Sequence, residues 1–161
     1  MEIEDLGPAE RFAAGAIGEP GSRRFYLQVT ADGEAHSLLA EKQQIAALAA
    51  QGLEVLDANG VSSDTTAIER LVESGLGVAD PGDGNERFRV GTMSIAMAPS
   101  ELLTITIESI DEDDAVTFVI APEQFRAMAA IALAVVASGR PICPWCRLPM
   151  NPDDHECPAR N

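Results

Sequence analysis

Residues 24–40 read RFYLQVTADGEAHSLLA, and this stretch decides the fold. Its first part, Arg24 to Thr30, is rich in aromatic and β-branched residues and roughly alternates, which predicts a strand. Asp32 and Gly33 follow, and this pair readily adopts the positive φ angles of a tight hairpin turn. His36 to Ala40 then predicts the partner strand. We therefore expect an antiparallel hairpin at the centre of the first half of the chain.

The sequence on either side of this hairpin extends it into a unit of three strands and a helix. Arg11 to Gly18 predicts an earlier strand, which the turn signal Glu19-Pro20-Gly21 ends. A helix is expected to begin at Glu41, because apolar residues then recur at helical spacing. That apolar stripe consists of Ile45, Leu48, Ala49, Leu53 and Leu56.

The second half of the chain shows the same order of elements. Arg87 to Thr92 resembles Arg11 to Ala16 and predicts a strand. Two more strands and a helix are expected at Leu102 to Ile110, at Ala115 to Ile120, and from Pro122 onward, where Pro suits a first helical turn. The pattern indicates an internal duplication of about residues 11–50 and 87–138. The alternative is that two unrelated meanders with a trailing helix look alike by composition.

These elements predict an α+β domain over residues 1–138, with a short helix and a loop over residues 62–86 between the repeats. We expect an antiparallel sheet with both long helices on one face, because each unit alone leaves an apolar sheet face half covered. Helices on opposite faces, or a parallel pair between the halves, would contradict the internal duplication. The predicted core consists of Ile45, Leu48, Leu53, Phe125, Met128, Ile131, Leu133 and Val135 beneath Leu27, Val29, Ile105 and Ile107.

Composition narrows the classes of partner and the compartment. The chain has 26 acidic residues against 11 Lys and Arg, a formal net charge of −15, which argues against binding to nucleic acid or anionic membrane. Its longest apolar run, Ala127 to Ala137, is too short to span a bilayer. Met1 to Asp5 is acidic and has no secretory signal. Three Cys suit a metal site better than a disulfide framework, so we expect a cytoplasmic protein.

The tail, residues 139–161, predicts a zinc site. Its four donors are Cys143, Cys146, His155 and Cys157. A Cys-x-x-Cys turn directs two sulfurs at one point, and four N or S donors complete the tetrahedral shell of a structural Zn²⁺. The alternatives are a redox Cys-x-x-Cys centre and a coincidental cluster. If His155 is not a ligand, the metal has an open position and catalysis at it becomes feasible.

Several motifs resemble one known family. They are Arg11-Phe12-x-x-Gly15, Glu41-Lys42-Gln43-Gln44, Phe88-Arg89-Val90-Gly91-Thr92-Met93, and a tail that combines Cys143-Pro144-x-Cys146 with Pro152-x-x-His155-x-Cys157-Pro158. Together they resemble an actinobacterial family catalogued as domain of unknown function 3090, over nearly the whole chain. Members of that family generally carry Gly after the second Cys, where this chain has Arg147. The resemblance implies a zinc tail but no activity, substrate or partner.

Arginine residues form the candidate anion site. If the halves are pseudo-symmetric, Arg11 and Arg87 occupy matching strand starts, with Arg89 beside them, and converging guanidinium groups could hold a carboxylate or phosphate. Arg23 and Arg24 belong to the same cationic group. The alternative is surface pairing of these arginines with the many acidic residues.

Three functional hypotheses remain open on the sequence. The first is a non-catalytic binding or adaptor domain with a protein partner, because no nucleophile is placed against a base and His36 has no nearby nucleophile. The second is an enzyme that acts on a small anionic metabolite through the arginine residues. The third is a single-strand nucleic-acid binder, and stacking and charge would come from Trp145, Arg140, Arg147 and Arg160.

Overall fold

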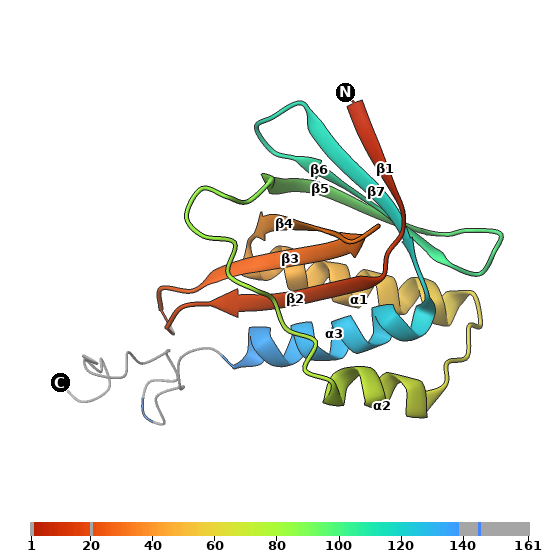
Figure 1. The fold of residues 1–161 in the computed structure, drawn as a ribbon. Coiled ribbons are helices and arrows are strands. Elements are labelled where there is room, and N and C mark those ends of the chain that lie inside the picture. Colours follow the sequence, from red (N-terminus) through yellow and green to blue (C-terminus); the bar gives the residue numbers. More distant parts are fainter. Residues whose placement is uncertain (1, 20, 139–144, 146–161) are drawn as a thin grey trace.

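The computed structural model describes residues 2–19, 21–138 and 145. Within them the chain forms a seven-stranded sheet and three helices (Figure 1). The strands are β1 (Glu2–Pro8), β2 (Arg11–Ile17), β3 (Arg24–Ala31), β4 (Glu34–Ala40), β5 (Phe88–Met97), β6 (Leu103–Ser109) and β7 (Asp114–Ile120). The helices are α1 (Lys42–Ala58), α2 (Thr65–Glu73) and α3 (Pro122–Ala137). The α+β class is as predicted.

The sheet is mixed, with strand order β1-β7-β6-β5-β4-β3-β2. Strands β2 to β4 are antiparallel, as are β5 to β7. The two halves meet where β4 pairs with β5 in parallel, through Leu38 with Phe88 and Leu39 with Arg89. The β1 strand also pairs with β7 in parallel. The prediction of an all-antiparallel sheet is therefore wrong, and the parallel pair between the halves contradicts the internal duplication.

The central hairpin forms as the sequence predicted. Asp32 and Gly33 have φ angles of 52° and 77°, the left-handed conformation that the turn needs. The flanking residues Ala31 and Glu34 pair directly, and the antiparallel register continues to Phe25 and Ala40.

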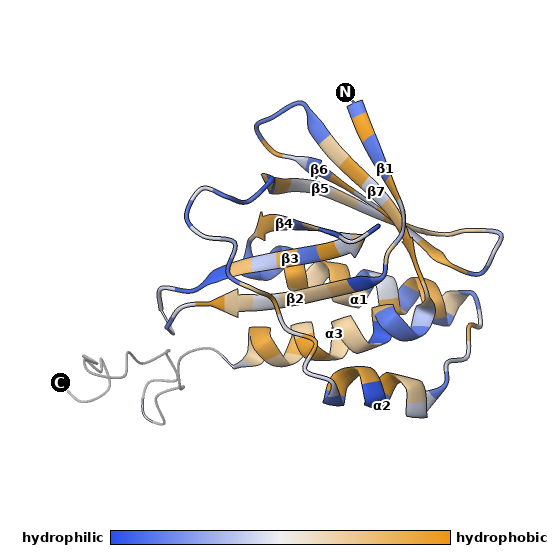
Figure 2. Ribbon diagram, in the orientation of Figure 1, coloured by the Kyte–Doolittle hydropathy of each residue, from blue (hydrophilic) through white to orange (hydrophobic). Residues whose placement is uncertain are grey.

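Strand β1 was not predicted, and it curls the sheet. Its first half is mostly hydrophilic, as Figure 2 shows, and most of its residues are exposed. After it, the Ala9 amide donates to the Val119 carbonyl at 2.8 Å and the Glu10 amide to the Thr30 carbonyl at 2.8 Å. The segment before β2 is therefore bonded both to β7 and to β3, which brings the two ends of the sheet together.

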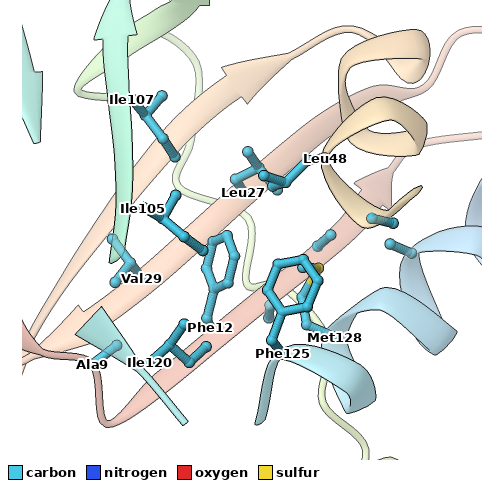
Figure 3. Packing of buried hydrophobic residues seen from close by; sticks show 14 of the residues in the cluster. Ala9, Phe12, Leu27, Val29, Leu48, Ile105, Ile107, Ile120, Phe125 and Met128 are labelled. Carbon is cyan, nitrogen blue, oxygen red and sulfur yellow. The ribbon is translucent and has the colours of Figure 1, made fainter. Parts of the chain in front are cut away.

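The long helices pack against each other on one face of the sheet (Figure 1). In Figure 3, Phe12 lies between the sheet residues and the helix residues. Its ring packs edge-on against that of Phe118, and the two ring centroids are 5.0 Å apart. Of the predicted core, most residues are buried or partly buried in this layer: Leu27, Val29, Ile45, Leu48, Leu53, Ile105, Ile107, Phe125, Met128 and Ile131. Leu133 is 41% exposed, so its placement in the core was wrong, and Val135 is only half-buried.

A helix and a loop connect the halves. The predicted helix over residues 62–74 is α2, and the Asp64 carboxylate caps it by accepting from the amides of Thr66 and Ala67. Residues 75–86 have no regular structure, as predicted for this loop, but they are held to the sheet. Val78 packs against Gly15 of β2, where an added Cβ would approach the Val78 Cγ2 to 2.7 Å. None of the described helices is long and apolar enough to cross a membrane.

Candidate functional site

Arg87, just before β5, is the centre of a polar cluster. Its Nε and one terminal nitrogen donate to the two carboxylate oxygens of Asp114, both at 2.9 Å. Its other terminal nitrogen donates to Glu4 at 2.6 Å and contacts the His36 Nδ1 at 3.2 Å. The Arg87 amide also donates to the Ser37 carbonyl at 2.7 Å, which fixes its backbone beside β4. One side chain thus connects β1, β4 and β7.

The Arg87–Asp114 pair stabilises the charged form of both groups. The bidentate hydrogen bonds from Arg87 lower the pKa of Asp114 below its usual value, against the opposing effect of burial. The same hydrogen bonds raise the pKa of Arg87. The Arg87 side chain is 22% exposed and that of Asp114 30% exposed, so water screens this pair less than an open surface pair.

His36 is buried next to this pair, with 9% of its surface exposed. A guanidinium can only donate hydrogen bonds, so in the contact with Arg87 the His36 Nδ1 is the acceptor. In the part of the chain that the structure describes, the Nε2–H has no hydrogen-bond partner. The Nε2 atom is not fully buried, so an acceptor from outside the cluster can reach it.

An open hollow of about 570 Å³ lies beside His36 and Arg87. A second one, of about 510 Å³, shares Glu4 and Arg87 with it and extends to Glu2 and Asp114. We call the two together the His36 hollow. Besides Arg87, its charged lining consists of the five carboxylates of Glu2, Glu4, Glu34, Asp80 and Asp114. The hollow therefore carries a strong excess of negative charge.

Three of these acids, Glu2, Glu34 and Asp80, have no cationic partner among the described residues. Glu34 at the start of β4 makes no ion pair with a described residue, and Asp80 accepts only from the Gly82 amide, at 2.9 Å. Since Arg87 is already bonded to Asp114 and Glu4, it leaves Glu34 and Asp80 unneutralised. Their negative potential favours a positively charged ligand.

The loop after α2 forms one wall of the hollow, and Gln28 holds it. The Gln28 side-chain amide is bonded to Ala79 in both directions: its Nε2 donates to the Ala79 carbonyl, and its Oε1 accepts from the Ala79 amide at 2.8 Å. Gln28 also donates to the Ser37 hydroxyl at 3.0 Å. Because Gln28 is only 6% exposed, these bonds are sheltered from water and place Asp80 at the rim.

The arginines of the candidate anion site do not come together. Arg11 donates to the Gly77 carbonyl and lines a separate hollow near α2, whereas Arg87 is bonded to carboxylates. Arg89 is exposed on β5, next to the junction with β4. Arg24 pairs with Asp83 at 2.7 Å, and Arg23 donates to the Ser138 hydroxyl at 3.1 Å. Arg24 and Arg87 therefore form ion pairs with acidic residues, which was the alternative to an anion site.

The predicted zinc ligands lie outside the described residues. This holds for Cys143, Cys146, His155 and Cys157. Within residues 2–19, 21–138 and 145, no group of three or more His, Cys, Asp or Glu side chains is arranged to hold a metal ion.

Sequence reasoning missed most of the His36 hollow. The sequence assigned no role to Asp114, and Glu4 lies in the strand that was not predicted. For His36 it indicated only that no nucleophile is nearby. The available signal was alternation: Asp114 is two residues before the buried Val116, on the same side of β7.

The comparison with known proteins gives one result. The chain matches the family described as "Protein of unknown function (DUF3090)" over residues 5–157. No curated protein and no solved structure matches it. The matched range contains the whole described core, from Ala9 to Ala132, and extends through the predicted zinc ligands. The chain therefore belongs to the DUF3090 family.

Proposed function

We propose that this protein is a non-catalytic adaptor that binds a basic segment of a partner protein in the His36 hollow. The observation that carries the proposal is the combination of His36, whose Nε2 has no hydrogen-bond partner among the described residues, with acids that no described cation neutralises, Glu34 and Asp80 among them. An Arg or Lys side chain supplies the cation for the acids, and a peptide carbonyl supplies the acceptor for His36. One peptide segment can satisfy both needs.

The alternatives have less support. An enzyme acting on an anionic metabolite through a cleft between Arg11 and Arg87 needs free guanidinium donors, and those of Arg87 are bonded to Asp114 and Glu4. A single-strand nucleic-acid binder can use the exposed ring of Trp145, 63% exposed, but the net charge of −15 opposes it.

The adaptor proposal includes the tail. Structural Zn²⁺ at Cys143, Cys146, His155 and Cys157 would order a segment whose residues are too few to form a core of their own. Four protein ligands would close the metal shell, so the metal would supply rigidity rather than a catalytic centre.

The test is a titration of isotope-labelled protein, followed by NMR, with a capped tripeptide Gly-Arg-Gly. The matched control peptide contains citrulline, which has nearly the shape of Arg without its charge. We expect the arginine peptide to shift the signals of His36 and Ala79 and to bind with a roughly millimolar Kd that weakens with salt. Equal binding of the citrulline peptide would contradict the proposal.

Protein variants locate the binding. We expect Glu34→Gln and Asp80→Asn each to weaken binding of the arginine peptide by about threefold to tenfold, since each removes one unpaired charge from the hollow. The control is Glu54→Gln, which removes the same charge from an exposed position of α1 away from the hollow. If all three variants bind alike, the peptide senses the net charge of the molecule and no local site exists.

A further inference from the structure

Although the protein is strongly acidic, Arg11 has no acidic partner among the residues that the structure describes. It begins β2 and is partly buried, and its single hydrogen bond within the described chain goes to the backbone carbonyl of Gly77. A backbone carbonyl neutralises no charge, and a guanidinium has five N–H donors. Arg11 therefore retains both its charge and several donors. Arg24, Arg87 and Arg126 each contact a carboxylate, whereas Arg11, like Arg23, Arg70 and Arg89, pairs with no described acid.

The free side of Arg11 borders a small, half-enclosed hollow of about 170 Å³ between β2, α2 and the start of α3. Its lining is mostly apolar and includes Phe12, which is 1% exposed, Leu76, which is 8% exposed, and Leu71 of α2. We call it the Arg11 hollow. Apolar walls exclude water from one side of a guanidinium and so strengthen its attraction to an anion.

The other polar groups of this hollow are already engaged. The Glu10 carboxylate accepts from the Gly33 amide at 3.1 Å, which turns it toward the β3–β4 hairpin. Gln124 donates to the Glu10 backbone carbonyl at 3.0 Å, and the Ser74 hydroxyl donates to the Leu71 carbonyl at 2.7 Å. Glu10 and Arg11 are thus the charged groups of this hollow without an ion-pair partner among the described residues, and the bond to Gly33 holds the Glu10 carboxylate toward the hairpin.

From these observations we infer that the Arg11 hollow is a binding site for a small monocarboxylate with a short apolar chain. The carboxylate would lie on the Arg11 guanidinium, and the chain would lie against Phe12, Leu71 and Leu76. This site is independent of the proposed adaptor function and lies apart from the His36 hollow. A nucleotide or a larger cofactor does not fit, because pockets for such ligands measure about 300–1,000 Å³.

The volume also sets the length of the ligand. A water molecule occupies about 30 Å³ in the liquid, so the hollow holds about six groups of that size. A carboxylate with a chain of about three or four further carbons matches this number. A phosphate would place a second negative charge on a single arginine, which makes it a poorer ligand for this site.

Valerate is the probe, and its uncharged amide, valeramide, is the matched control. Each is titrated into protein with labelled leucine methyl groups, and NMR follows the signals of Leu71 and Leu76. We expect valerate to shift both signals saturably, with a roughly millimolar Kd, and valeramide to bind at least about tenfold more weakly. No shift of these signals, or equal shifts with both probes, would overturn the inference.

Three variants separate the guanidinium from the apolar wall. Arg11→Gln is expected to weaken valerate binding by about tenfold or more. Arg89→Gln removes the same charge from an exposed position of β5 and is expected to leave the affinity for valerate unchanged. Leu71→Phe retains Arg11 but fills the hollow and should abolish binding. If Arg11→Gln does not fold, Leu71→Phe still tests the inference. Valerate binding that persists in Leu71→Phe would show that valerate binds outside the Arg11 hollow.

Discussion

Gly52 lies in the middle of α1, where helix propensity alone disfavours glycine by roughly 1 kcal/mol relative to alanine. Its position is explained by Phe125 of α3. A Cβ at residue 52 would lie 1.9 Å from the Phe125 Cζ, and the Phe125 ring is fully buried. The absence of a side chain at Gly52 therefore lets the two helices approach and gives the aromatic ring its place in the core.

Gly52→Ala should destabilise the protein by about 1–3 kcal/mol, because overpacking in a close-packed core outweighs the gain in helix propensity. Urea unfolding at neutral pH measures the effect. Gln51→Ala is the control, since Gln51 is exposed on the same helix, and it should change stability by less than about 0.5 kcal/mol. A stabilised Gly52→Ala would mean that Phe125 can move aside at little cost.

Local sequence patterns could not reveal this contact. The apolar stripe of α1 and the Pro122 start of α3 were predictable, because both signals lie within a few residues of the helices they describe. The partner of Gly52, by contrast, is more than seventy residues away in the chain. A lone Gly in a helix indicates that something approaches closely, but not what it is.

Among the secondary-structure elements, the strands within each half were predictable and the junctions between the halves were not. Turn residues and alternation define β2 to β4 and β6 to β7. The parallel β4–β5 pair has a topological cause: a unit of three antiparallel strands ends in the direction in which it began, and the helices return the chain for a second unit in the same direction. The expectation of an antiparallel junction overlooked this return.

Strand β1 was missed because its residues are mostly exposed and acidic, and it depends on distant partners. It pairs with β7, and Glu4 bonds to Arg87, which also binds Asp114. The candidate site was missed for the same reason. Its charged groups come from four elements, and only their three-dimensional arrangement shows which acids Arg87 neutralises and which it leaves free.

Asp114→Asn should remove the bidentate pair that joins β7 to the start of β5, and should destabilise the protein by about 1 kcal/mol at pH 7. Arg87 lowers the pKa of Asp114 in the folded state, so the pair stabilises the fold above the unfolded-state pKa, near 4. That stabilisation is lost as the pH falls through the lower, folded-state pKa. The wild type and the variant should therefore converge in acid.

Urea titrations between pH 7 and pH 2 measure this convergence. Asp83→Asn is the matched control, because Asp83 pairs with Arg24 on the surface and its side chain is 94% exposed. That variant should cost less than about 0.5 kcal/mol at any pH. A constant difference between Asp114→Asn and the wild type over the whole range would show that the loss comes from packing rather than from charge.

At the scale of the whole molecule, the described core and the predicted metal site are separate in sequence. The buried apolar residues of the described chain all lie between Ala9 and Ala132, and the two long helices and the curled sheet enclose them. The four predicted zinc ligands begin at Cys143, after the end of α3 at Ala137. The described core therefore contains no predicted metal ligand, and we expect its packing not to depend on one.

Purified protein should contain one zinc per chain, and Cys143→Ser or Cys157→Ser should lower that content sharply, because a tetrahedral site that loses a thiolate binds zinc far more weakly. Metal analysis after gel filtration measures this, and full occupancy in both variants would remove the assignment.

Chelation should leave the far-UV circular dichroism and the urea midpoint of the domain nearly unchanged, because zinc binding stabilises only the segment that it orders, which is the tail. The tail should respond instead: limited proteolysis should cut after residue 138 in the chelated protein and more slowly in the zinc-loaded one. A large fall of the urea midpoint on chelation would show that the metal supports the core, and the separation of core and tail would then be wrong.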